Sequence, residues 1–520
     1  MRDVKRPRGN AATLAKGALS GVLAAAAGVS AATGLAALLG GVPSPIVSVG
    51  NRAVDLAPDF LKDFAVREFG TADKPILIGG VIFTLAILAA ITGVIGLRKP
   101  RLAYALVAGL GLLALASAVI DRTADAPRVV VILPAIVTIV VSLTLLSVFL
   151  QAIGLAPHSA DELTSDFDRR KFLKAVLGAS AIVIVGGAIG KFFGTAAARA
   201  SREAIRIPKP ADAASPVPSG VSPDVKGISK YLTPNRDFYR VDTALRVPDV
   251  PAEGWNLRIH GMVDKELNLS FRDLLRERLV ERRITIACVS NDVGGPYIGN
   301  ATWVGTPIKD LLERAGVKNG ADAILSTSAD DFTVGTPIRD LTDGRDALLA
   351  IAMNGQPLPL EHGFPVRMVV PGLYGYVSAT KWLVDMEVTR FADFTAYWTD
   401  RDWDPEAPIK TSSRIDVPRS SQSFPRDKVR VGGVAWAQTK GIKRVEVSVD
   451  DGDWVEADLA AEDTADTWRQ WSWRWNDATP GTHKLTVRST DASGYTQTPK
   501  RVSPRPNGAS GWHSVQFSVD

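Results

Sequence analysis

The stretch Ile284-Thr285-Ile286-Ala287-Cys288-Val289-Ser290-Asn291-Asp292-Val293-Gly294-Gly295 decides how the second half of this 520-residue chain is interpreted. Its apolar start predicts a β-strand that ends at the cysteine, and the two glycines predict a loop after it. Cys288 is the one cysteine of the sequence, so it has no disulfide partner within it. A thiolate at a strand end sits on a rigid support and can bind a metal; a buried, inert core cysteine is the alternative.

A second segment, residues 362–383, combines basic residues with glycines. His362, Arg367 and Lys381 stand around the Gly-rich stretch Pro371-Gly372-Leu373-Tyr374-Gly375. Free backbone amides next to an arginine and a lysine suit a phosphate or a pterin-like anion. A solvated turn explains such a segment equally well when it is taken alone.

The two halves of the chain differ in composition, which predicts separate regions. Residues 229–400 mix strand-like and helical runs and predict an α+β domain. Residues 401–520 show short strands alone and predict an all-β sandwich. Residues 196–228, rich in Ala, Ser and Pro, predict an extended linker. The net charge of +5 is modest for this length, so no nucleic acid partner is expected.

Residues 1–195 are long uncharged runs of Ala, Val, Leu, Ile and Gly, which predict a transmembrane anchor. About 20 apolar residues of helix cross the roughly 30 Å of hydrocarbon in a bilayer. Five runs reach or approach this length, at residues 17–42, 75–97, 102–120, 129–153 and 172–194.

The basic residues predict the orientation of these five helices, because basic loops stay cytoplasmic. With a cytoplasmic N-terminus, the inner segments 1–16, 98–101 and 157–174 hold twelve Arg and Lys, whereas the outer loops 43–74 and 121–128 hold six. An odd number of crossings then places residues 200–520 outside the cytoplasmic membrane.

Residues 168–174 read Asp-Arg-Arg-Lys-Phe-Leu-Lys and precede a short apolar run. This pattern resembles the twin-arginine export signal, which favours translocation of a folded domain; ordinary inside-positive charge before a helix is the alternative. The predicted helix cores offer no histidine or methionine as axial ligands, so no haem is expected in this chain. The helices are interpreted as an anchor, or as a docking surface for another membrane protein.

Five stretches, in the same order, resemble the sulfite oxidase superfamily of molybdopterin-dependent oxidoreductases. The resemblance implies a sulfite-oxidase-type molybdopterin-binding fold in residues 229–400, and a molybdenum atom bound by Cys288 beside the pterin dithiolene. It also implies that residues 401–520 are the immunoglobulin-like dimerisation module of the family. The matching stretches are residues 235–239, 284–291, 298–308, 352–359 and 362–383.

The resemblance also carries over the family's cofactor contacts, residue by residue. Asn235, His362, Arg367 and Lys381 are expected to fix the cofactor, and Tyr239, Tyr376 and Trp303 to line the substrate approach. The full expected cofactor-binding set is Asn235, Phe238, Tyr239, Cys288, Thr327, His362, Arg367, Ser378, Ala379, Thr380 and Lys381.

The chain departs from the sulfite-oxidising members where they gather arginines around the sulfite anion. Those places hold Pro234, Val293 and the pair Tyr376 and Val377. The place of the family's catalytic tyrosine holds Trp403, with Tyr397 close by. Without the anion clamp, tight binding of sulfite is not expected.

The sequence therefore predicts an extracytoplasmic enzyme that transfers an oxygen atom on a small substrate such as a sulfoxide or another S- or N-oxide. Cys288, Tyr239 and Tyr376 are the expected catalytic residues, and Cys288 is the expected metal ligand. Expected partners are the small substrate, membrane lipid, a separate electron-transfer protein, for which a membrane protein is one candidate, and a second copy of the chain. Two alternatives stay open: sulfite oxidation, and a non-catalytic binding protein with a vestigial redox fold.

Overall fold

The computed structural model describes residues 11–58, 61, 73–121, 126–153 and 168–520. The chain divides into two compact units. One contains residues 1–197 with Ala244–Asp249, and the other contains Ala198–Thr243 with Val250–Asp520. Of the predicted inner segments 1–16 and 157–174, residues 1–10 and 157–167 lie outside the described residues.

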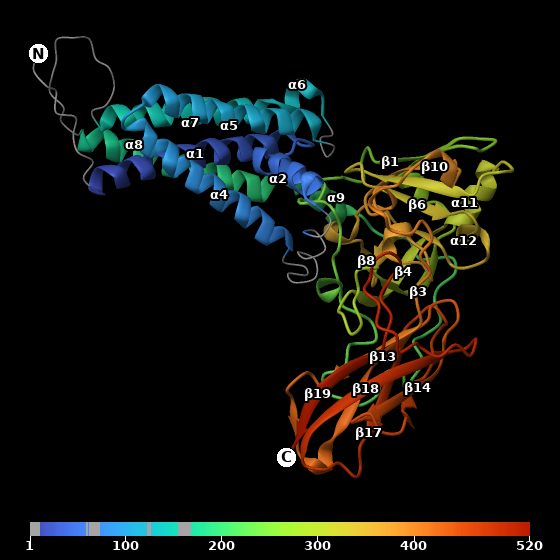
Figure 1. The fold of residues 1–520 in the computed structure, drawn as a ribbon. Coiled ribbons are helices and arrows are strands. Elements are labelled where there is room, and N and C mark those ends of the chain that lie inside the picture. Colours follow the sequence, from blue (N-terminus) through green and yellow to red (C-terminus); the bar gives the residue numbers. More distant parts are fainter. Residues whose placement is uncertain (1–10, 59–60, 62–72, 122–125, 154–167) are drawn as a thin grey trace, which may run out of the picture. The chain divides into compact units, whose positions relative to one another are not determined.

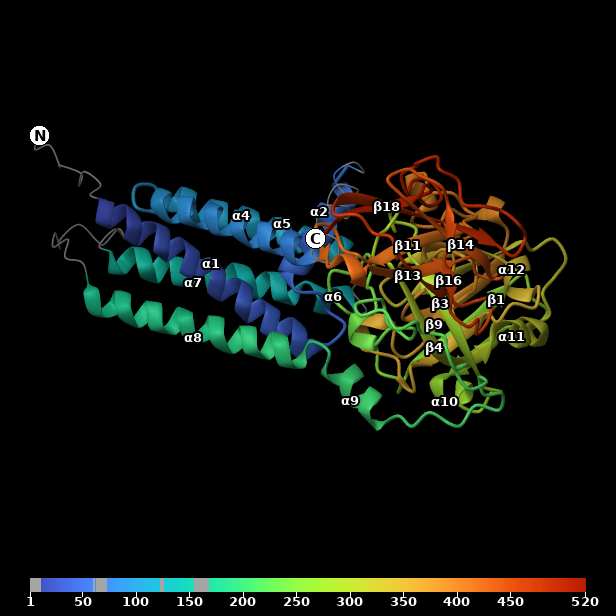
Figure 2. The same ribbon diagram turned by 90° about the horizontal axis from the view of Figure 1, so that it is seen from below.

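The first unit is helical, and its long helices run side by side (Figures 1 and 2). Within the described part of the chain, five helices are long and apolar enough to cross a membrane, which confirms the predicted helical region. The structure adds α2, an amphipathic helix in what was expected to be an outer loop. The helices are α1 (Ala11–Leu39), α2 (Pro45–Leu56), α4 (Asp73–Gly96), α5 (Pro100–Ile120), α6 (Arg128–Val131), α7 (Leu133–Ala152) and α8 (Arg169–Phe193).

Glycines let the helices of this unit approach closely. A side chain at Gly21 of α1 would collide with the Ala89 carbonyl of α4, and one at Gly186 of α8 would collide with the Ser30 carbonyl of α1. Small residues at such crossings are the usual means of packing helices in a lipid environment, where apolar burial alone gives little driving force. The sequence of α1, rich in Gly and Ala, therefore fits a central position among the other helices.

The second unit begins with a mixed α+β region built on two sheets. One sheet has the order β2-β1-β10-β5-β6, in which only β1 and β10 pair in parallel. The other has the order β3-β4-β7-β8, with β9 also pairing with β7. The strands are β1 (Asn256–Gly261), β2 (Leu267–Ser270), β3 (Val280–Ala287), β4 (Ile298–Pro307), β5 (Ala323–Ser328), β6 (Thr333–Pro337), β7 (Leu348–Met353), β8 (Gln356–Pro357), β9 (Arg367–Val369) and β10 (Leu383–Thr389).

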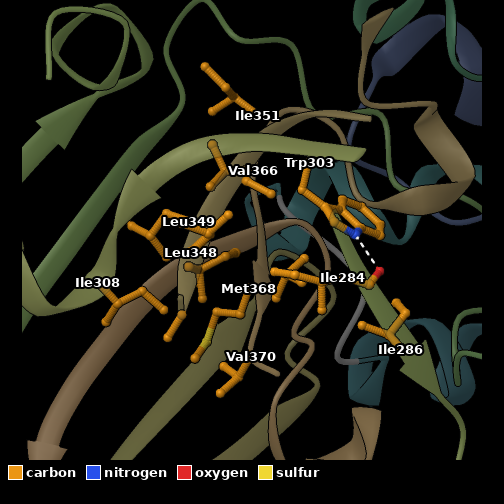
Figure 3. Packing of buried hydrophobic residues seen from close by; sticks show 14 of the residues in the cluster. Ile284, Ile286, Trp303, Ile308, Leu348, Leu349, Ile351, Val366, Met368 and Val370 are labelled. Carbon is orange, nitrogen blue, oxygen red and sulfur yellow. Dashed lines mark hydrogen bonds between the residues drawn. The ribbon is translucent and has the colours of Figure 1, made fainter. Parts of the chain in front are cut away.

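Short helices connect these strands, and one core joins β3, β4, β7 and β9 (Figure 3). Trp303 of β4 is fully buried there, and its indole Nε1 donates a hydrogen bond to the Ile284 carbonyl of β3 at 3.1 Å. Helix α11, the longest helix between two of these strands, ends at Gly316, whose positive φ of 70° forms a left-handed cap. The connecting helices are α10 (Phe271–Leu274), α11 (Ile308–Ala315) and α12 (Arg339–Thr342), and α9 (Ala196–Ala204) precedes the first strand.

The C-terminal region is a β sandwich, as predicted. Its two sheets have the orders β11-β13-β17-β16 and β12-β19-β18-β14-β15. Trp471, Val445 and Phe517 are buried between them. The strands are β11 (Ser412–Val417), β12 (Ser423–Phe424), β13 (Arg430–Trp436), β14 (Ile442–Val449), β15 (Val455–Glu456), β16 (Asp458–Leu459), β17 (Arg469–Arg474), β18 (Gly481–Asp491) and β19 (His513–Val519).

Most of the segment expected as an extended linker is packed against the second unit. Residues 198–228 all belong to that unit. Asp212 forms a parallel bridge with Val280 at the start of β3, and Val221 is buried in the core. The proline-rich composition predicts a free spacer, but burial of apolar side chains such as Val221 lowers the free energy relative to their exposure to solvent.

Candidate active site

A cavity opens in the second unit at the end of β3. Its empty volume is about 880 Å³, which includes a mouth open to solvent. The cavity brings together eight of the residues that the sequence predicted for the site. These are Phe238, Tyr239, Cys288, His362, Arg367, Tyr376, Ala379 and Lys381.

Strand β3 is fixed from behind by the β sandwich, and this places Cys288. The Thr285 carbonyl of β3 accepts a hydrogen bond from Gln438 Nε2 at 3.0 Å, and the Thr285 hydroxyl accepts one from the Trp468 amide at 2.8 Å. Arg283, 7% exposed, forms an ion pair with Asp463 of the sandwich. These contacts hold the strand that carries the cysteine on a rigid support, which is what a metal ligand needs.

The environment of Cys288 suits a single metal ligand. The Cys288 amide donates to the Tyr297 carbonyl at 2.9 Å, and its carbonyl accepts from the Asn291 amide at 3.1 Å. Burial raises the pKa of the Cys288 thiol, while hydrogen bonding from Ser290 and the charge of Lys381 lower it. Within the described residues no group of three His, Cys, Asp or Glu side chains could hold a metal. A metal here would need its other ligands from a cofactor, as a pterin dithiolene provides.

Arg367 is a buried cation with no carboxylate in ion-pair distance among the described residues. Its guanidinium donates to two carbonyls, of His362 at 3.2 Å and of Met368 at 3.3 Å, and lies 5.2 Å from the Trp303 ring centre. Its residue is 5% exposed, and burial lowers the pKa of Arg367 to about 10. A buried charge that lacks a counter-ion costs free energy, so this site favours an anionic ligand.

His362 is held as a neutral imidazole next to this cation. Its Nε2 donates to the Asn235 carbonyl at 3.0 Å, which leaves Nδ1 as an acceptor. Burial and the charge of Arg367 lower the pKa of His362 to about 4. At neutral pH the imidazole therefore adds no charge to the cavity and can accept a hydrogen bond from a ligand.

Lys381 is ion-paired with Asp242, a residue that the sequence analysis missed. The side chains of Lys381 and Asp242 are 10% and 6% exposed, and Asp242 also accepts a hydrogen bond from Arg240 at 2.8 Å. Asp242 follows the predicted segment 235–239 by only three positions. The sequence around Asp242 contains no pattern that indicates a pairing with a lysine 139 residues away.

Four of the predicted cofactor residues do not line the cavity. Asn235 accepts from Asn354 at 2.8 Å, Thr380 is paired with Ser326 at 2.7 Å, and the Ser378 hydroxyl donates to the Tyr374 carbonyl at 3.0 Å. Thr327 lies in β5 beside Ser328, which does line the cavity. Their cofactor roles stay predictions.

Trp303 was expected to line the substrate approach, and this was wrong. It is 0% exposed and packs in the core between β3, β7 and β9. Its place within the matching stretch 298–308 gave no indication of the side of β4 on which it lies. The Trp303 ring contributes to the site only through its contact with the Arg367 guanidinium.

The two tyrosines expected to be catalytic differ in their surroundings. The Tyr376 hydroxyl donates to the Asp404 carbonyl at 2.6 Å and is therefore engaged. The Tyr239 hydroxyl has no hydrogen-bond partner among the described residues. Burial and the nearby Cys288 raise the pKa of Tyr239, whereas Arg367 lowers it, so the phenol stays protonated next to the cysteine.

Aromatic rings that were not predicted as site residues form another part of the wall. Phe332, Trp382 and Trp398 line the cavity, together with Trp403, which stands where the family has its catalytic tyrosine. Asp330 also lines it. The clustering of Trp398 and Trp403 in the sequence was the available signal for this part of the site.

Comparisons with known proteins agree with this architecture. Residues 244–398 match the family described as oxidoreductase molybdopterin binding domain, and residues 412–487 match a bacterial Ig domain. The chain is 30% identical to sulfite oxidase of Gallus gallus over 327 residues, which cover 53% of this chain and 70% of that protein. It is 36% identical over 166 residues to the uncharacterized oxidoreductase YuiH of Bacillus subtilis, covering 31% of this chain and 81% of that one.

Among solved structures, the sulfane dehydrogenase SoxCD from Paracoccus pantotrophus is similar, with a TM-score of 0.49 and 22% identity over 56% of this chain and 84% of that chain. The sequence matches, the half-buried Cys288 thiol at the end of β3 and the buried Arg367 without a carboxylate partner agree with one another. The chain belongs to the sulfite oxidase superfamily of molybdopterin-dependent oxidoreductases and carries a C-terminal immunoglobulin-like domain.

Proposed function

We propose that this enzyme reduces a small S- or N-oxide on the extracytoplasmic side of the membrane in which its five apolar helices are embedded. The observation that carries the substrate class is the charge of the cavity. Its cations are Arg367 and Lys381, and its acids are Asp242 and Asp330. These charges balance before any ligand binds, and an anionic cofactor would make the cavity negative. A substrate anion such as sulfite is therefore disfavoured relative to a neutral oxide.

The residues present fit a molybdenum–pterin cofactor. Cys288 would bind the metal, Arg367 and Lys381 would face the anionic groups of the cofactor, and His362 Nδ1 would accept a hydrogen bond. When bound, this cofactor supplies the two-electron oxygen-atom chemistry that side chains cannot perform. The cavity supports this assignment because Arg367 is buried next to Cys288 without a carboxylate of its own.

Tyr239 is the residue proposed to deliver a proton. Reduction of an oxide consumes two electrons and two protons and releases the reduced compound and water. The Tyr239 hydroxyl lies near Cys288 and Arg367, is free of hydrogen bonds within the described residues, and keeps its proton at neutral pH. It can donate that proton to the oxide oxygen as the bond to sulfur or nitrogen breaks. Tyr376 then serves to shape the approach, since its hydroxyl is bound to the Asp404 carbonyl.

The location and the partners belong to the same proposal. The distribution of basic residues supports an outward-facing second unit, and the five apolar helices support a membrane anchor. The electrons would come from a separate electron-transfer protein, for which a membrane protein is one candidate. The immunoglobulin-like domain supports pairing of two copies of the chain, by analogy with the dimerisation module of the family.

The test uses the purified full chain in detergent. We expect about one molybdenum per chain, reduction of dimethyl sulfoxide or trimethylamine N-oxide with a reduced viologen dye, and sulfite oxidation with ferricyanide at under about one hundredth of that catalytic efficiency. A kcat/KM for sulfite above that for every oxide would refute the substrate class and favour sulfite oxidation. A preparation without molybdenum and pterin, from a host that makes the cofactor, would favour the vestigial binding protein.

A further inference from the structure

One carboxylate oxygen of the cavity has no hydrogen-bond partner. Asp330 lies in the hairpin between β5 and β6 and lines the cavity, and its Oδ1 is buried without a partner in the described part of the chain. Burial raises the pKa of Asp330, while the Ser328 side chain and the Phe332 amide lower it to a lesser degree. An acceptor buried without a donor costs about 1 to 3 kcal/mol, so it marks a place where a ligand is expected to supply the donor.

The cations near Asp330 are already engaged with another acid. Lys381 is ion-paired with Asp242, and Arg240 donates to that same carboxylate. Asp242 and Asp330 repel each other, which further raises the pKa of Asp330, whereas the charge of Lys381 lowers it. The dithiolene and phosphate groups of the cofactor are anionic and would add to this repulsion. A positive charge for Asp330 is therefore best supplied by the substrate.

Aromatic rings continue from the hairpin of Asp330 around the cavity. Neighbouring ring centres lie 5.1 to 6.1 Å apart. The face of an aromatic ring attracts a cation, and several rings around a carboxylate are the usual receptor for a substituted ammonium group. The outer side of this series already binds one cation, since the Arg401 guanidinium lies 3.9 Å from the ring centre of Tyr397. The rings, in order of contact, are Phe332, Tyr397, Trp398, Trp403 and Tyr376, of which all but Tyr397 line the cavity.

We propose that the cavity selects oxides that carry a protonated amine or a quaternary ammonium group, with the Asp330 carboxylate facing the cation and the aromatic rings covering its methyl or methylene groups. This inference rests on the proposed function and names its substrate class. The competing role for Asp330 is to accept hydrogen bonds from the pterin ring of the cofactor.

The first experiment measures binding to the molybdenum-loaded full chain, with no turnover needed. Tetramethylammonium and tert-butyl alcohol have similar shapes and differ in charge. By calorimetry we expect tetramethylammonium to bind at least tenfold more tightly than the alcohol, and Asp330→Asn to remove this preference while the affinity for the alcohol stays the same. Asp331→Asn is the matched control, since Asp331 is the next residue of the same hairpin and is exposed, and asparagine tolerates its φ of 59°. It should bind both probes like the wild type.

The second experiment compares turnover of three sulfoxides, using a reduced viologen dye as donor. They are dimethyl sulfoxide, the cationic 2-(dimethylamino)ethyl methyl sulfoxide, and the anionic (methylsulfinyl)acetate. We expect the cationic sulfoxide to have a kcat/KM about tenfold above the neutral one and the anion to be the poorest. Asp330→Asn should raise KM for the cationic sulfoxide alone.

Each outcome has one meaning. Equal binding of the two probes, or an unchanged preference in Asp330→Asn, overturns the cation site. Loss of molybdenum and pterin from Asp330→Asn, with Asp331→Asn fully loaded, also overturns it and assigns the carboxylate to the cofactor. If the cation preference is present but no sulfoxide is reduced, the proposed oxide reduction is refuted and the cation site stands.

Discussion

Two buried arginines of the second unit should differ in how much their replacement by methionine lowers the free energy of unfolding. Arg367 and Arg283 are 5% and 7% exposed. Arg283 is paired with Asp463, whereas Arg367 has no carboxylate partner among the described residues. We therefore expect replacement by methionine, which keeps an apolar stem of similar length, to be costly at position 283 and nearly neutral at position 367 when the cofactor is absent.

The structure sets the size of each effect. A pKa lowered from 12.5 to about 10 means that burial of the charged Arg367 costs about 3 kcal/mol. Its two hydrogen bonds to carbonyls, at 3.2 and 3.3 Å, return about 1 kcal/mol each. Arg367→Met should then change the free energy of unfolding by no more than about 1 kcal/mol. Arg283→Met leaves the buried Asp463 carboxylate without a cation, with a hydrogen bond from the Tyr231 hydroxyl at 2.6 Å, and this costs about 3 to 5 kcal/mol.

The assay is urea unfolding of the cofactor-free chain, expressed in a host that cannot make molybdopterin. All twelve tryptophans lie beyond residue 250, so their fluorescence reports on the second unit. In a host that makes the cofactor, Arg367→Met should retain less than about a tenth of the wild-type molybdenum. If Arg367→Met destabilises the cofactor-free chain as much as Arg283→Met does, the buried guanidinium stabilises the fold by itself and our reading of it as a site for an anion is wrong.

Three further predictions concern single residues. Cys288→Ser should purify folded with its urea midpoint nearly unchanged and without molybdenum; retention of stoichiometric metal would contradict its role as ligand. Tyr239→Phe should keep its molybdenum and lose at least about a hundredfold in kcat for oxide reduction, and an unchanged kcat would exclude its hydroxyl as the proton donor. Burial lowers the pKa of His513 to about 4, and its Nδ1 accepts from the Ile415 amide at 3.0 Å. The unfolded chain therefore binds a proton between pH 6.5 and 4 that the folded chain does not, and folding stability should fall by up to about 3 kcal/mol as pH drops through that window. His513→Asn should show a smaller slope than the wild type, because the lowered pKa of His362 keeps its own contribution over the same window, and an equal slope in both proteins would contradict the assignment.

The sequence was sufficient for the fold because its strongest signals are local. Uncharged runs longer than about 17 residues predicted the apolar helices, and the alternation of Val445 and Val447 in a short strand predicted the sandwich. Cys288 at the end of an apolar strand was equally visible. These features depend on periodicity and composition, which a single chain displays directly.

The rest of the site depends on contacts between distant segments, which no local pattern contains. Asp242 could not be assigned to Lys381, because the pairing follows from how two loops meet. Trp303 was placed in the substrate approach although its side of β4 faces the core. Asp330 carried no sequence signal at all, since an aspartate in a hairpin turn is ordinarily a solvated residue.

The bracing of β3 by the β sandwich has a consequence for how the enzyme is made. Arg283 and Thr285 leave the ribosome 180 or more residues before Asp463 and Trp468, the groups that hold them. Strand β3, which leads to Cys288, therefore cannot form these stabilising contacts until nearly the whole polypeptide has been synthesised. We expect a nascent chain stalled ahead of residue 460 to be unable to retain metal, so that acquisition of the prosthetic group is a late event in the maturation of this protein.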